Sequence, residues 1–273
     1  MKVVLITLAA TLLIQIGYFL WKLSASGQAK IGGAPFKEVV ISLVTDWRWV
    51  LGFFATSFGW LLFVQATAIG DISLVQPLMS AGDLLLVLMA IIFLKERLGS
   101  FEWGGVLLTV LGAVFLAIEG QDSLTSNYVA KDLLILLSSL VLVGALMFAN
   151  RKRIVVSPEV LLALVVGLCF GTGAILTKAM TSDLLVPGEP SLRLLIDPLL
   201  PAVILANVLG LVFLQAAFQR GRAAVIVPLQ LAMCNVVTVV AGISIFSENI
   251  TFYRGFGIIL IVIGTGLLQI KKS

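Results

Sequence analysis

The sequence predicts an all-α bundle of about nine transmembrane helices, and three observations lead to this fold class. The chain has 273 residues, of which 60% are hydrophobic and 12% are charged, whereas soluble domains carry about 25% charged residues. Apolar segments of roughly 18 to 24 residues, long enough to cross a bilayer, recur along the chain. They lack the two-residue alternation of barrel strands, so helices must satisfy the backbone. We therefore expect a polytopic membrane protein without a soluble catalytic domain.

Nine apolar segments, separated by charged or turn-rich breaks, define the predicted helices. The first segment follows Lys2 as in a signal peptide, but its full length and the absence of a clean small-residue cleavage pattern favour a retained helix. Residues 36–44 are too short and too charged to span the membrane and are not counted. The predicted helices are residues 3–21, 47–69, 72–94, 101–118, 132–149, 160–180, 198–219, 223–246 and 252–270.

Lysine and arginine residues are divided unequally between the two sides of this predicted bundle. One side holds thirteen of the 18 and the other holds five, and basic loops stay in the cytoplasm. We therefore predict an outside N-terminus and a cytoplasmic C-terminus in a cell membrane, either plasma or inner. The net charge of +4 then belongs to cytoplasmic loops, and we expect no nucleic-acid partner.

The two halves of the chain repeat one another. Residues 63–78, FVQATAIGDISLVQPL, align with residues 213–229, FLQAAFQRGRAAVIVPL. Five helices, an odd number, separate each helix from its counterpart, so the copies enter the membrane in opposite directions. This predicts an inverted repeat of residues 1–120 (helices one to four) and 159–273 (helices six to nine), with a linker helix in 121–158. Further aligned pairs are Lys22 and Lys178, Glu96 and Glu248, Gly105 and Gly257, and Gly112 and Gly264.

The first copy contains Pro77, the helix-ending LKERL of residues 94–98 and the glycine-spaced GGVLLTVLGAVFLA of residues 104–117, in this order. These motifs resemble those of the drug/metabolite transporter superfamily and its EamA-like repeats. The resemblance covers nearly the whole chain, although the second copy reads FSENI at the turn and keeps only the glutamate. It implies export or exchange of small organic solutes.

A four-plus-one-plus-four arrangement of helices is more similar to the NIPA magnesium-transporter branch of that superfamily. The segments SLVQPL, residues 73–78, and GTGAILTK, residues 171–178, share this similarity. This branch would imply cation transport. The metal remains unassigned at this stage, because a hard cation needs several oxygen ligands and Asp83 is the only acid placed deep in a predicted helix.

Candidate binding residues lie near the middle of the third predicted helix. Gln76, Ser80 and Asp83 share one face of that helix. A carboxylate at the bilayer centre costs a few kcal/mol, so we expect Asp83 to face a cavity and to exchange a proton or hold a cation there. The alternative is a protonated or hydrogen-bonded aspartic acid that joins helices.

The second half offers amides at the equivalent depth. Asn235 follows Cys234 in the middle of the eighth predicted helix, and Asn207 aligns with Ser57 of the first half. We predict that Ser57, Asn207 and Asn235 complete a polar layer with Asp83. Hydrogen bonding between helices would explain these residues equally well.

Three duplicated residue pairs have competing interpretations. Pro77 and Pro228 lie near the starts of their helices and would either gate the cavity or simply initiate the helix. Lys22 and Lys178 are expected to reach toward the lipid headgroups. Glu96 and Glu248 are expected to bond the exposed amides of the helix that follows each of them.

These predictions favour a secondary transporter that moves a small molecule or ion by alternating access between two inverted repeats. The chain has no histidine and no phosphate-binding GxxxxGK[ST] motif, so we expect no cofactor and not an enzyme. Beyond the lipid bilayer and the substrate, a second copy of the chain is a candidate partner. The alternatives from other classes are a lipid-handling protein and a non-transporting receptor or assembly subunit.

Overall fold

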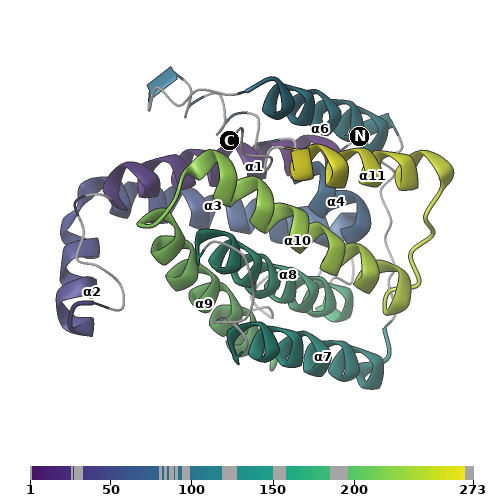
Figure 1. Ribbon diagram of the computed structural model, residues 1–273. Coiled ribbons are helices and arrows are strands. Elements are labelled where there is room, and N and C mark those ends of the chain that lie inside the picture. Colours follow the sequence, from purple (N-terminus) through teal and green to yellow (C-terminus); the bar gives the residue numbers. More distant parts are fainter. Residues whose placement is uncertain are drawn as a thin grey trace.

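The computed structural model is all-helical over the residues that it describes, which are 2–25, 27, 33–79, 82, 85, 89, 92–93, 99–118, 128–149, 158–184 and 196–267. Ten helices have definite bounds in this part of the chain (Figure 1). They are α1 (Lys2–Ala25), α2 (Phe36–Thr45), α3 (Trp47–Ile69), α4 (Ile72–Met79), α6 (Ser100–Ile118), α7 (Ala130–Ala149), α8 (Pro158–Leu184), α9 (Leu200–Phe218), α10 (Ala223–Ser244) and α11 (Phe252–Leu267).

The polytopic helical bundle predicted from the sequence is confirmed. Among the described residues, five helices are long and apolar enough to cross a membrane: α1, α3, α7, α8 and α9. The predicted helix 72–94 is described as α4 and as single helical residues beyond it, at Leu85, Met89, Ile92 and Phe93. Residues 36–45 do form a helix, α2, but its 10 residues are too few to span a bilayer.

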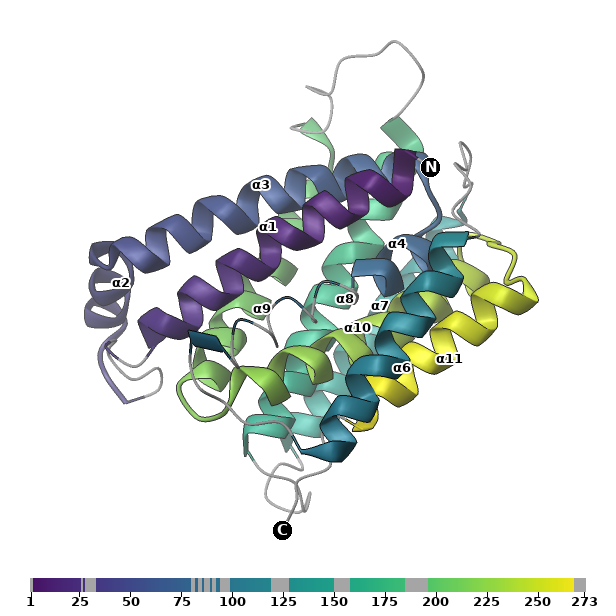
Figure 2. The ribbon, with the colours of Figure 1, turned by 90° about the horizontal axis from the view of Figure 1, so that it is seen from above.

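The helices pack in pairs around a central group. Helix α1 lies along α3, α8 packs against both α9 and α10, and α6 lies along α11 (Figure 2). Helix α4 sits between these pairs and contacts α1, α8 and α10. Helix α7 packs on α8 at the periphery, and most of its side chains are exposed. The central positions of α1, α3, α4, α8, α9 and α10 set up the site described below.

Helix α4 is held by contacts with two other parts of the chain. Both carboxylate oxygens of Glu248 accept hydrogen bonds from the first two amides of the helix, those of Ile72 and Ser73, at 2.8 and 2.9 Å. Thr11 Oγ1 of α1 donates to the Met79 carbonyl oxygen at 2.7 Å. The first two amides of the helix therefore have partners, and every residue from Ile72 to Met79 is buried.

The two aligned lysines make equivalent contacts at opposite ends of the bundle. Lys22 Nζ donates hydrogen bonds of 3.0 and 2.6 Å to two carbonyl oxygens at the end of α9. Lys178 Nζ donates two of 2.9 Å to carbonyl oxygens at the end of α3. Each lysine thus caps a helix C-terminus, where the helix dipole favours a cation. The acceptors are Phe218 and Gly221 for Lys22, and Thr67 and Gly70 for Lys178.

Two aligned glycine pairs meet where α6 crosses α11. A Cβ added to Gly112 would lie 2.6 Å from the Gly257 carbonyl oxygen, and one added to Gly264 would lie 2.7 Å from the Gly105 carbonyl oxygen. Gly112 thus meets Gly257, and their aligned counterparts, Gly264 and Gly105, meet each other in the same way. The contacts are reciprocal, as in a two-fold symmetric interface. Only glycine allows the two backbones to come this close.

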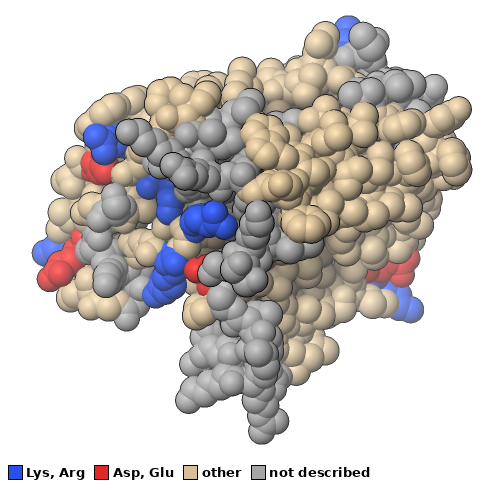
Figure 3. Space-filling model, turned by 45° about the horizontal axis from the view of Figure 1, so that its top comes forward, with Lys and Arg blue, Asp and Glu red and all other residues tan. Residues whose placement is uncertain are grey.

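The outer surface is largely apolar. Figure 3 shows the basic side chains gathered mainly at one end of the molecule, while a broad uncharged face covers much of the rest. Large apolar side chains such as Phe54, Phe58 and Leu61 of α3 are more than half exposed. Such a surface is typical of a protein whose solvent is lipid.

Candidate functional site

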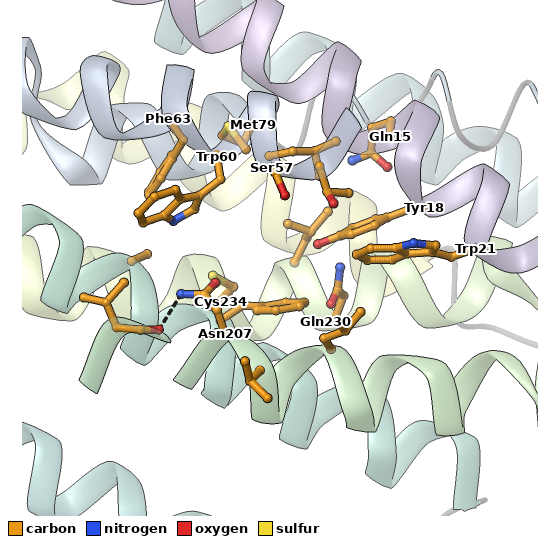
Figure 4. A pocket seen from close by; sticks show the side chains of 18 of the residues that line it. Gln15, Tyr18, Trp21, Ser57, Trp60, Phe63, Met79, Asn207, Gln230 and Cys234 are labelled. Carbon is orange, nitrogen blue, oxygen red and sulfur yellow. Dashed lines mark hydrogen bonds between the residues drawn. The ribbon is translucent and has the colours of Figure 1, made fainter. Parts of the chain in front are cut away.

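A cavity of about 340 Å³ lies among α1, α3, α4, α8, α9 and α10 (Figure 4). Both sequence copies contribute to it, because α1, α3 and α4 precede the predicted linker and α8, α9 and α10 follow it. Its volume falls within the range of known small-molecule sites, about 300–1,000 Å³. The cavity is therefore large enough to be the substrate site of a transporter.

Aromatic side chains form much of the cavity wall. Figure 4 shows Trp60 and Phe63 at one end of the cavity and Tyr18 and Trp21 at the other. The rings of Tyr18 and Trp21 are stacked with centroids 5.7 Å apart. Trp21 Nε1 donates to the Trp49 carbonyl oxygen at 3.1 Å, which fixes its indole ring. The remaining aromatic lining residues are Phe53 and Phe170.

Four uncharged amides supply most of the polar atoms of the lining: Gln15, Gln76, Asn207 and Gln230. Gln76 Nε2 of α4 donates to Cys234 Sγ of α10 at 3.1 Å, so this contact joins the two sequence copies. Asn207 Nδ2 donates to the carbonyl oxygen one turn earlier in α9, at 2.8 Å. None of the described lining residues carries a charge.

The cavity brings together three of the six predicted binding residues. Ser57, Gln76 and Asn207 line it, and the Ser57 hydroxyl donates to the Phe53 carbonyl oxygen at 2.7 Å within α3. Asn235 is fully buried in α10 but is not part of the lining. The predicted residues Ser80 and Asp83 lie outside the described residues.

The two prolines predicted to act in gating both lie inside helices. Pro77 is a buried residue of α4, and Pro228 lies in the first turns of α10. Because proline has no amide hydrogen, Pro77 cannot donate to the carbonyl four residues earlier. Gating by either residue stays a prediction.

The sequence analysis missed several of the lining residues. Gln230 and Gln15 are each 1% exposed, yet they lie in segments that were interpreted only as apolar spans. Trp21, the last residue of the first predicted helix, is 4% exposed and also lines the cavity. The signal that could have found Gln230 was its spacing from Cys234, which follows it by one helical turn on the same face of the helix.

A cluster of four charged side chains lies apart from the cavity, where α3 ends and α4 begins. Arg254 donates to the Asp71 carboxylate at 2.9 Å, and Lys178 lies within electrostatic reach of Asp71 and Glu248. Burial raises the pKa of the Glu248 carboxyl, and the Asp71 carboxylate adds to the rise, while hydrogen bonds from Ser73 and Ile72 oppose it. Opposite charges thus balance one another at this end of the bundle.

Two expectations about these charges are wrong. Lys178 does not reach toward headgroups, because its side chain is 3% exposed and bonds the end of α3. Glu248 bonds the start of α4, in the other sequence copy, rather than the helix that follows it, because the turn after α10 folds back over α4. Glu96, its counterpart, lies outside the described residues.

Metal ligands do not gather in the described part of the chain. No group of three or more histidine, cysteine, aspartate or glutamate side chains able to hold a metal ion occurs among these residues. The cavity offers instead aromatic faces, amide donors and acceptors, and hydroxyl groups. This combination suits an organic molecule better than a bare hard cation, which prefers several carboxylate and carbonyl oxygens.

Comparisons with known proteins give a consistent result. Residues 3–118 match the model of the EamA-like transporter family. Over 96% of its length, the chain is 27% identical to the "Probable magnesium transporter NIPA9" of Arabidopsis thaliana, of which the alignment covers 80%. A 64-residue stretch, 23% of the chain, is 33% identical to an "Uncharacterized transporter in cobO 3'region" from Sinorhizobium sp, covering 45% of that protein. No solved structure matches.

Proposed function

We propose that this protein is a membrane transporter that moves a small organic solute by alternating access, because residues 3–118 match the model of the EamA-like transporter family. The observation that carries the proposal is the cavity of about 340 Å³ that both sequence copies line. A substrate site at the interface between two repeats is the arrangement found in many secondary transporters. The walls contain no charged residue among those described, which favours an organic molecule.

Reciprocal contacts support the inverted repeat on which this mechanism depends. Lys22 and Lys178 each cap the second membrane-length helix of the opposite copy, and Gly112 and Gly264 make matching contacts across the α6 and α11 crossing. Because the contacts are reciprocal, the arrangement at one end of the bundle can form equally at the other end. Rocking one copy against the other would then expose the cavity first to one side of the membrane and then to the other.

We propose that Asp83 couples the movement to an ion gradient. Its place in the third predicted helix, one turn after Ser80, puts a carboxylate near the bilayer centre. A carboxylate there can take up and release a proton during the cycle. The chain has no nucleotide-binding motif to supply the work otherwise.

A second candidate substrate is a divalent cation. The observation that favours it is the similarity to a protein named as a probable magnesium transporter over 96% of the chain. Carbonyl oxygens and one carboxylate would have to supply the ligands, because no cluster of three acidic or sulfur side chains occurs among the described residues.

A flux assay in proteoliposomes separates these candidates. We expect uptake of an organic solute that depends on a pH gradient, and loss of that dependence in Asp83→Asn. The matched control is Asp132→Asn, an exposed acid at the start of α7, which should transport normally. Magnesium uptake without any organic flux would favour the second candidate. Background flux for every solute in vesicles with correctly inserted protein would contradict transport.

A further inference from the structure

One side chain in the cavity lacks the hydrogen-bond partners that a buried amide requires. Gln230 of α10 is 1% exposed, and neither Oε1 nor Nε2 has a hydrogen-bond partner in the described part of the structure. Figure 4 shows its amide pointing into the cavity toward Tyr18. A buried polar group without a partner destabilises the protein, so a ligand that pairs with this amide is favoured over a ligand that does not.

The chemistry of the amide restricts that ligand. A glutamine side chain presents one acceptor and two donor hydrogens side by side. The group that complements both at once is another donor and acceptor pair held in a plane, as in a carboxamide or in the edge of a nucleobase. A carboxylate offers only acceptors and an ammonium group only donors, so either would leave one side of Gln230 unpaired.

The rings around the amide indicate the rest of the molecule. Tyr18 and Trp21 stack with each other at 5.7 Å between centroids, and Trp60 and Phe63 face the cavity from its other end. Flat apolar rings pack well between such faces, because stacked or edge-to-face aromatic contacts add stability beyond the apolar area that they bury. The ligand that fits both features has an aromatic ring bearing a carboxamide-like group.

The charge of the ligand follows from the lining. No charged side chain occurs among the described lining residues, and an ion transferred into such a cavity would lose its hydration without gaining a partner. The cavity therefore favours a neutral molecule over an anion or cation of the same size.

We propose that the cavity binds small, uncharged aromatic molecules that carry a carboxamide-like group, which pairs with the amide of Gln230. This proposal rests on the transport function proposed above and names its substrate class. Gln230 acts as the specificity-determining residue, while the aromatic side chains hold the ring.

The structure supplies a matched control. Gln215 of α9 is also 1% exposed, and both of its amide atoms also lack a hydrogen-bond partner among the described residues. It is absent from the cavity lining. Gln215→Leu therefore removes an equally buried amide without changing the cavity.

The test measures binding to the purified full-length protein by isothermal titration calorimetry at pH 7. The probes are benzamide, benzoate, benzylammonium and acetophenone, which share a ring and differ only in charge and hydrogen-bonding groups. We expect benzamide to bind at least 10-fold more tightly than either ion and about 10-fold more tightly than acetophenone. Gln230→Leu should weaken benzamide about 10-fold and acetophenone less than 3-fold, while Gln215→Leu should change neither.

A second variant guards against a simple folding defect. Gln230→Glu replaces the amide donor by a carboxylate acceptor, so it should favour the benzylammonium cation over benzamide and reverse the wild-type order. The proposal is overturned if benzoate or benzylammonium binds as tightly as benzamide, if no probe binds, or if both Gln230 variants keep the wild-type order.

Flux measurements keep this proposal separate from the transport function. Benzamide binding without flux of any solute in proteoliposomes contradicts the transport function and leaves the binding specificity standing. Flux of an ion or of another solute, with no benzamide binding, contradicts the specificity alone.

Discussion

The two ends of the bundle are built on the same plan and differ in charge. At one end Lys22 caps α9, and its ammonium lies 5.9 Å from the Phe218 ring centroid. At the other end Lys178 caps α3 and lies within electrostatic reach of Asp71 and Glu248, and Asp71 pairs with Arg254. Lys22 is half-buried, whereas Lys178 is 3% exposed. The Lys178 end is therefore the more tightly closed end in this structure.

The sequence assigns opposite charges to equivalent positions at these ends. The spacing that relates Pro77 to Pro228 relates Asp71 to Arg222, and the spacing that relates Glu96 to Glu248 relates Glu102 to Arg254. The positions equivalent to the Asp71 and Arg254 pair are therefore Arg222 and Glu102, with the acid and the base exchanged. In this structure Arg222 is exposed, while Asp71 and Arg254 are joined at 2.9 Å. The two ends therefore differ in burial: the acid and base that pair at the Lys178 end are largely shielded from solvent, whereas Arg222 is exposed.

The largest expected difference between the ends concerns the two lysines. Lys178→Met leaves two backbone carbonyl oxygens and the neighbouring acids without their cation, and breaking such a buried arrangement costs about 3–5 kcal/mol. Lys22→Met removes similar bonds from a half-buried site, so we expect about 1–2 kcal/mol. Denaturant unfolding in detergent micelles, followed by circular dichroism, measures both. Equal losses would contradict the difference between the two ends.

The glycines at the α6 and α11 crossing test the symmetry itself. Gly112→Ala and Gly264→Ala each place a Cβ within 2.7 Å of a backbone carbonyl oxygen, and overpacking of this kind costs about 1–3 kcal/mol. The two losses should be equal, because the contacts are reciprocal. Gly104→Ala is the control, since nothing lies within 4 Å of its added Cβ, and it should gain up to about 1 kcal/mol. Unequal losses would show that the crossing is not symmetric.

The sequence predicted the helices well because their signal is local. Apolar length alone located α3 at residues 47–69, the bounds found in the structure. Aligned motifs also singled out Lys178 and Glu248 as special residues, but they could not identify the partners. Those partners lie in the other copy, at Thr67, Gly70, Ile72 and Ser73, and only the three-dimensional arrangement of the copies brings them together.

The candidate site was predicted less completely, for a physical reason. A polar residue in an apolar helix is conspicuous, which is how Ser57, Gln76 and Asn207 were found. Whether such a residue lines a cavity depends on which face of its helix meets which neighbour, and a single helix does not encode this. Asn235 and Cys234 show the effect: they are adjacent in sequence, yet only Cys234 lines the cavity.

The ion pair at the closed end provides a smaller effect. Asp71→Asn and Arg254→Gln should each destabilise the protein by about 1–2 kcal/mol, and a double-mutant cycle should give a coupling energy within 0.5–3 kcal/mol. The equivalent cycle with Glu102→Gln and Arg222→Gln should give no more than about 0.5 kcal/mol, because Arg222 is exposed. Unfolding free energies of wild type and of the six variants measure both cycles. Similar coupling energies at the two ends would contradict this difference in burial.

The pH dependence of stability is the smallest expected effect, and it arises only at the Lys178 end. Burial raises the pKa of Glu248 in the folded protein, so the folded state holds a proton that the unfolded chain releases at lower pH. Unfolding free energy therefore falls as pH rises from the ordinary glutamate value, about 4.3, through the raised value.

Glu248→Gln removes this titration and should flatten that part of the profile. Asp132→Asn, at the exposed start of α7, should leave it unchanged. Unfolding temperatures measured between pH 4 and about pH 7 therefore compare wild type with both variants. A wild-type profile that rises over this range relative to Glu248→Gln would mean that the hydrogen bonds from Ile72 and Ser73 outweigh burial. The closed end would then hold a carboxylate anion, balanced by Lys178 and Arg254, in every state of the protein that keeps this contact.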